Sequence, residues 1–77
     1  LALSRGDLAA ALVQYDASAQ LRPKLPAAQL GQSFALMGLG RFEDARHALD
    51  EAERLGGDPR VVSAQRRELS RRTSAHP

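Results

Sequence analysis

The chain has 77 residues and a net charge of +2, and 43% of its residues are hydrophobic against 26% charged. This length allows one small domain at most, and the composition is too apolar for a disordered segment. The absence of cysteine excludes disulfides and thiolate metal sites, and no apolar run reaches the about 18–20 residues that a membrane span needs. Because the chain begins with Leu1 rather than Met, we expect a piece of a longer protein.

The charged side chains are unevenly distributed along the chain. Residues 1–26 carry three basic and two acidic side chains, residues 27–59 carry three and six, and residues 60–77 carry five and one. The basic excess therefore lies in the last segment. Ten of the 11 basic residues are Arg, a bias typical of bacterial proteins from GC-rich genomes.

The spacing of apolar residues predicts helices joined by short turns. Pro23 follows one predicted helix and Pro26 suits the first turn of the next, while Gly56-Gly57 suits a C-terminal cap. Asp58-Pro59 suits an N-cap and a first turn. The predicted helices cover residues 1–5 (the tail of a helix whose start is missing), 7–21, 26–38, 41–55 and 58–72, and residues 73–77 form a predicted frayed tail.

An internal repeat relates two of these helices. Residues 6–21 (GDLAAALVQYDASAQL) align without a gap with residues 40–55 (GRFEDARHALDEAERL), at an offset of 34 residues. The alignment predicts that Tyr15 and Leu49 lie at equivalent buried positions. The identical pairs are Gly6 and Gly40, Ala11 and Ala45, Asp16 and Asp50, and Leu21 and Leu55.

A period of 34 residues is that of the tetratricopeptide repeat. The motif Gly6-Asp7-Leu8, Ala11-Leu12, Tyr15 and Leu21-Arg22-Pro23 resembles the second helix of that repeat, and residues 40–45 resemble the opening of the next copy. The chain departs from the family pattern at Gln29 and at Gln32-Ser33. The resemblance implies an all-α fold of antiparallel helix-turn-helix repeats, a fragment of a helical solenoid. It places repeats at residues 1–57, the first of them truncated at its N-terminus, a C-terminal capping helix at residues 58–72 and a flexible tail at residues 73–77.

The predicted helix 26–38 is the most informative one, because residues 25–40 contain no charged side chain. Leu30, Phe34 and Met37 share one stripe, and Gln29, Gln32 and Ser33 form a predicted polar edge. The apolar stripe has two interpretations. It is either core, or part of a concave peptide-binding groove that Leu3 continues from the previous repeat.

The last two helices each have two interpretations. In helix 41–55, Asp50 lies four residues from both Arg46 and Arg54, a spacing that predicts ion pairs along one side of the helix. We interpret this side as a solvated convex face of the protein. The alternative interpretation is that it is a docking surface for a basic partner. In helix 58–72, the apolar residues lie on one side, which predicts a helix that caps the end of the repeats. The opposite side is basic, and the alternative interpretation is that it forms an anion-binding site for nucleic acid or another anionic surface. That site would consist of Arg60, Arg67 and Arg71.

No arrangement of residues predicts catalysis. His47 and His76 have no second metal ligand at the usual helical spacing, and the serines lack a nucleophile motif. We therefore expect no enzyme activity, no cofactor and no metal site.

The resemblance to tetratricopeptide repeats implies a protein-interaction or scaffolding module with a protein or peptide partner, which we expect in a bacterial multiprotein assembly. We expect no nucleic-acid binding by the chain. Because about three repeats are normally needed for stability, we expect contact with further repeats of a longer array or self-association. The sequence leaves open the partner, the process, and the choice between cytoplasm and periplasm.

Overall fold

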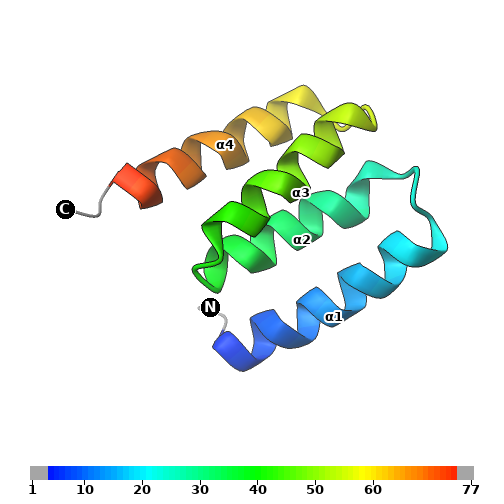
Figure 1. Cartoon of the computed structure of the whole chain (residues 1–77), viewed down its shortest axis with the longest axis horizontal. Coiled ribbons are helices and arrows are strands. Elements are labelled where there is room, and N and C mark those ends of the chain that lie inside the picture. Colours follow the sequence, from blue (N-terminus) through cyan, green and yellow to red (C-terminus); the bar gives the residue numbers. More distant parts are fainter. Residues whose placement is uncertain (1–3, 75–77) are drawn as a thin grey trace.

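The computed structural model describes residues 4–74, and this part of the chain forms four helices and no strand. Their bounds are α1 Arg5–Leu21, α2 Pro26–Gly38, α3 Phe42–Arg54 and α4 Pro59–Ser74. Successive helices run antiparallel because the turns between them are short (Figure 1). The prediction of an all-α fold of antiparallel helical repeats is confirmed.

The start of α1 differs from the prediction. Ser4 is the N-cap: its hydroxyl accepts a hydrogen bond from the Asp7 amide at 3.1 Å, and its own amide donates to the Asp7 carboxylate at 3.3 Å. This reciprocal capping box fixes the first turn. Ser4 and Arg5 therefore begin a helix rather than ending an earlier one, and the rest of the predicted segment, residues 1–3, lies outside the described residues.

The two later turns use the predicted glycine and aspartate. Gly40 and Gly56 have φ angles of 80° and 87°, a conformation that L side chains rarely adopt, so each glycine allows an abrupt helix end. Asp58 then accepts a hydrogen bond from the Arg60 amide at 2.9 Å, which caps α4. At its C-terminal end, α4 continues to Ser74. In this last turn the Thr73 hydroxyl donates a hydrogen bond to the Leu69 carbonyl at 3.0 Å.

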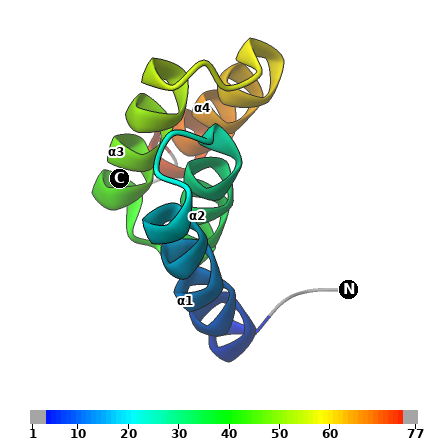
Figure 2. The same cartoon turned by 90° about the vertical axis from the view of Figure 1, so that its right-hand side faces the viewer.

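α2 is the central helix of the fold. It packs against α1, α3 and α4, whereas α1 packs against α2 alone among the described helices. In the side view, α3 and α4 lie next to each other on one side of α2, and α1 lies on the other (Figure 2). The core cluster lies where α2, α3 and α4 meet and consists of Leu36, Met37, Ala45, Ala48, Leu49 and Leu69.

The repeat-equivalent residues Tyr15 and Leu49 are not equally buried. Leu49 has no exposed surface, but Tyr15 is only half-buried, so the prediction that both positions are buried is wrong for Tyr15. The reason is the number of neighbouring helices, since α3 lies between α2 and α4 while α1 has a single neighbour.

A hydrogen bond between helices confirms the internal repeat. Gln32 of α2 donates to Asp16 of α1 at 2.7 Å, and 34 residues further on Arg66 of α4 donates to Asp50 of α3 at 2.9 Å. We call these two contacts the repeat clasps. They show that α4 contacts α3 at the position where α2 contacts α1. No helix within residues 4–74 is long and apolar enough to cross a membrane.

Candidate functional site

The packing of α2 reverses the expected positions of its polar and apolar residues. Ser33 has no exposed surface and Gln29 is 7% exposed, so the predicted polar edge lies largely inside the fold. Phe34, in contrast, is 53% exposed. Because three helices cover α2, the side that they leave open carries Ala27, Phe34 and Gly38 with half-buried Leu30, and it has no charged side chain.

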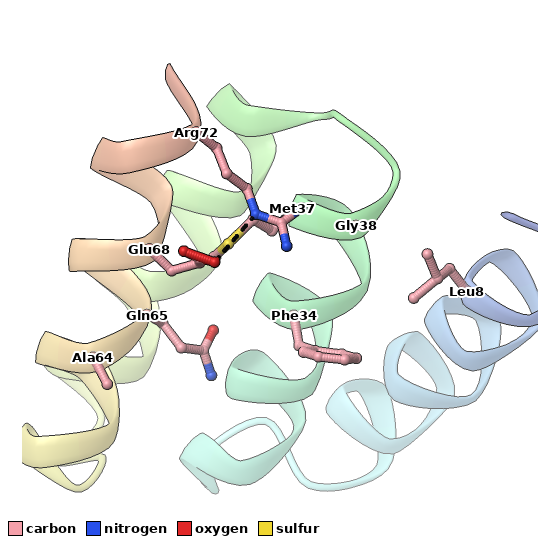
Figure 3. A pocket seen from close by; sticks show the side chains of 8 residues that line it. All are labelled: Leu8, Phe34, Met37, Gly38, Ala64, Gln65, Glu68 and Arg72. Atoms are coloured by element: carbon pink, nitrogen blue, oxygen red, sulfur yellow. Dashed lines mark ion pairs between the residues drawn. The ribbon is translucent and has the colours of Figure 1, made fainter. Parts of the chain in front are cut away.

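A hollow of about 510 Å³ lies along this open side, between α2 and α4. Figure 3 shows side chains of three helices that line it, with Phe34 of α2 between Leu8 of α1 and Gln65 of α4. We call it the α2–α4 hollow, and its lining residues are Leu8, Phe34, Met37, Gly38, Ala64, Gln65, Glu68 and Arg72.

Close packing shapes the α1 side of the hollow. Gly38 has no side chain, and a methyl group there would lie 2.7 Å from the Leu8 side chain. Leu8 is buried at 6% exposure because it fills this position. The glycine therefore lets α1 approach the end of α2.

Hydrogen bonds fix the α4 side. The fully buried Ser33 hydroxyl donates to the Gln65 side-chain oxygen at 2.6 Å, and the Gln65 amide nitrogen donates to the Leu30 carbonyl at 3.4 Å. A buried polar pair of this kind holds two helices in one register. The position of Gln65 in the hollow is thus set by α2 itself.

The end of the hollow towards the C-terminus is charged. Glu68 pairs with Arg71 and, at 3.6 Å, with Arg72. The hydrogen bond from Arg71 lowers the pKa of Glu68, so this carboxylate stays ionised at neutral pH. The hollow therefore offers an apolar surface from Leu8 to Met37 and an ion-paired boundary on α4.

The structure brings together part of the predicted groove. Phe34 and Met37 both line the hollow, although Met37 is buried at 5% exposure and contributes its floor. Leu30 packs against the core cluster from the edge. Leu3 lies outside the described residues. Leu8 and Arg72 could not be identified as lining residues from the sequence, because their placement depends on packing between helices.

The three arginines of the predicted anion site are exposed on α4. Arg60 pairs with Asp58 at 3.5 Å and Arg71 pairs with Glu68, so two of the three cations already have a carboxylate partner. Arg67 has no ion pair with another described residue.

The histidines form no metal site in the described part of the chain. His47 is exposed on α3, and His76 lies outside the described residues. Within residues 4–74, no group of three or more His, Cys, Asp or Glu side chains could hold a metal ion.

Comparison with known proteins gives one match. A family model described as tetratricopeptide repeat matches residues 2–68, which is most of the chain. No curated protein and no solved structure matches.

Proposed function

The chain belongs to the tetratricopeptide repeat family, a family of protein-interaction modules, and we propose that its α2–α4 hollow binds an apolar segment of a protein partner. In a longer array this hollow would be part of the concave groove. The partner would be another subunit of a bacterial multiprotein assembly.

The exposure of Phe34 carries this proposal. α2 buries a serine completely and a glutamine to 7% exposure, yet its large aromatic side chain is 53% exposed. Burial of an aromatic ring is among the larger single contributions to folding, so leaving it exposed costs stability. A partner that covers the ring would recover that free energy on binding, as aromatic anchors do in protein interfaces.

The lining chemistry supports an apolar ligand rather than an acidic chain end. Besides Phe34, the apolar lining residues of the hollow are Leu8, Met37, Gly38 and Ala64. The only cation of the lining is Arg72, which Glu68 already pairs. A ligand carboxylate would therefore compete with Glu68, whereas an aliphatic or aromatic side chain would bury apolar surface on both partners.

Selection from a displayed peptide library tests this proposal. We expect the complete chain to enrich peptides with bulky apolar residues, and we expect Phe34→Glu to abolish their binding because it places a charge in the hollow. Val13→Glu is the matched control, because Val13 is 68% exposed on α1 and lies outside the hollow. Enriched peptides that bind the Phe34→Glu variant as well as the unchanged chain would contradict the proposal.

A further inference from the structure

A second pocket, of about 340 Å³, lies on the other side of α2. At 100° per residue, the three residues that α2 contributes to it lie about half a turn around the helix from Phe34. We call it the α1–α3 pocket. Its lining residues are Leu12, Asp16, Gln29, Gln32, Leu36, Arg41, Asp44, His47, Ala48 and Glu51.

A residue that lines this pocket carries an unsatisfied polar atom. The Gln29 side chain is 7% exposed, and its buried Oε1 atom accepts no hydrogen bond from the described residues. A buried carbonyl oxygen without a donor destabilises a fold, so such groups call for a partner. The terminal amide can turn by half a rotation and exchange oxygen for nitrogen without moving the helix, which allows it to offer an acceptor to a bound group.

The charge of the lining favours a cationic donor. Asp16, Asp44 and Glu51 face one guanidinium, that of Arg41. Asp44 is paired with Arg41 at 2.7 Å, and Arg54 binds both carboxylate oxygens of Glu51. Asp16 accepts a hydrogen bond only from the neutral Gln32 amide, so within the described residues it is the one lining carboxylate without a cationic partner.

Gln32 links the two groups along the helix. Gln32 holds the Asp16 carboxylate at 2.7 Å, and Gln29 lies one helical turn before Gln32 on the same side of α2. Gln29 and Asp16 therefore line the pocket from the side of α2 that faces α1, on either side of Gln32 in the lining.

We propose that the α1–α3 pocket binds the ammonium group of a lysine side chain from a protein partner, which donates hydrogen bonds to Gln29 and Asp16. Lysine fits better than arginine because one Asp16 oxygen is already occupied by Gln32. A guanidinium binds best to a carboxylate with both oxygens free, whereas an ammonium directs its three donors to separate single acceptors. This surface is separate from the α2–α4 hollow, so the chain would contact partners on two faces.

An NMR titration of the complete chain tests the inference. The probe is Nα-acetyl-lysine methylamide, and the norleucine analogue, which lacks the ammonium group, is its control. We expect a saturable shift of the Gln29 side-chain amide signals with a millimolar dissociation constant, and a smaller effect from the arginine analogue. An equal response to norleucine, or no saturable response to lysine, would overturn the inference.

Two variants make the test specific. Asp16→Asn keeps an acceptor for Gln32 but removes the charge, so we expect it to raise the dissociation constant by about tenfold, the usual effect of losing one charge-assisted hydrogen bond. Glu43→Gln makes the same kind of change on α3 outside the pocket, and it should leave binding unchanged. Equal affinity in the Asp16→Asn variant would exclude the carboxylate as a ligand and overturn the inference.

The stability of a Gln29→Met variant gives an independent readout. Methionine has a similar shape and no unsatisfied acceptor, so we expect a higher urea midpoint together with loss of the lysine response. A lower midpoint would mean that the amide is satisfied within the fold, and it would also overturn the inference.

Discussion

The ring of Tyr15 occupies the space that a side chain at Gly31 would need. A methyl group at Gly31 would lie 2.3 Å from Tyr15 Cε1, far inside van der Waals contact. The glycine therefore sets how closely α1 approaches α2, the only described helix against which α1 packs.

We expect Gly31→Ala to lower the free energy of unfolding by about 1 kcal/mol. Overpacking costs about 1–3 kcal/mol, which exceeds the gain of about 1 kcal/mol from replacing a helical glycine. Gly6→Ala is the control, because the nearest atom to its new methyl group is a Ser4 oxygen at 3.7 Å. Urea unfolding of both variants measures the difference. A Gly31→Ala variant as stable as the unchanged chain would show that the Tyr15 ring moves aside freely.

The two repeat clasps should respond differently to salt. Arg66 pairs with both Asp50 and Glu53, so we expect a coupling free energy of about 0.5–1 kcal/mol between Asp50 and Arg66 that falls as salt is raised. The bond between Gln32 and Asp16 has one neutral partner and should change less. Double-mutant cycles with Asp50→Asn and Arg66→Gln, and with Asp16→Ala and Gln32→Ala, measure both couplings at low and high salt. Equal salt dependence would contradict this assignment.

The ion pair between Glu68 and Arg71 should make stability depend on pH. The pKa of Glu68 is lowered in the fold, so its contribution is complete above the unfolded value of about 4.3 and is lost as the pH falls through the folded value. We expect the urea midpoint to fall as the pH drops below about 4.3, and to fall less in Glu68→Gln. Glu43→Gln on α3 serves as control and should keep the full decrease. An unchanged decrease in Glu68→Gln would contradict a role for this carboxylate.

The arginines of α4 should not bind nucleic acid at physiological salt. Two of the three, Arg60 and Arg71, are already paired with carboxylates, which reduces the charge available to phosphates. We expect no measurable binding of duplex DNA or RNA at about 0.15 M salt. Submicromolar binding at this salt concentration would favour the alternative function. In that case, replacing all three arginines by Gln should reduce the slope of the logarithm of the binding constant against the logarithm of the salt concentration by about three.

The local features of this fold could be read from the sequence. The helix boundaries follow from proline, glycine and aspartate at the turns, and the repeat follows from residues that recur at an offset of 34. Both features depend on residues close in sequence, or on a pattern that the chain itself repeats. The start of α1 was missed because a serine followed three residues later by an aspartate is a weak signal within a helical pattern.

The features that depend on distant neighbours could not be read in this way. Ser33 was placed on a polar edge, but α4 brings Gln65 against it and buries it. The predicted ion pairs of Asp50 with Arg46 and Arg54 are also wrong, since Asp50 pairs with Arg66 of the neighbouring helix. In each case the deciding partner lies on another helix, and sequence spacing within one helix carries no information about it.

The exposure of Phe34 separates the two interpretations of its stripe most directly. The measurement is a pair of values for each of Phe34→Ala, Tyr15→Ala and Leu49→Ala: the free energy of unfolding, and the affinity for a peptide that the chain selects. Leu49 has no exposed surface and its truncation should cost about 2–5 kcal/mol. We expect Phe34→Ala to cost less stability than either other variant, yet to weaken peptide binding by about thirtyfold or more, the effect of losing an aromatic anchor. If Phe34→Ala destabilises the chain as severely as Leu49→Ala, or leaves peptide affinity unchanged, then Phe34 is a core residue and the α2–α4 hollow is not the binding site.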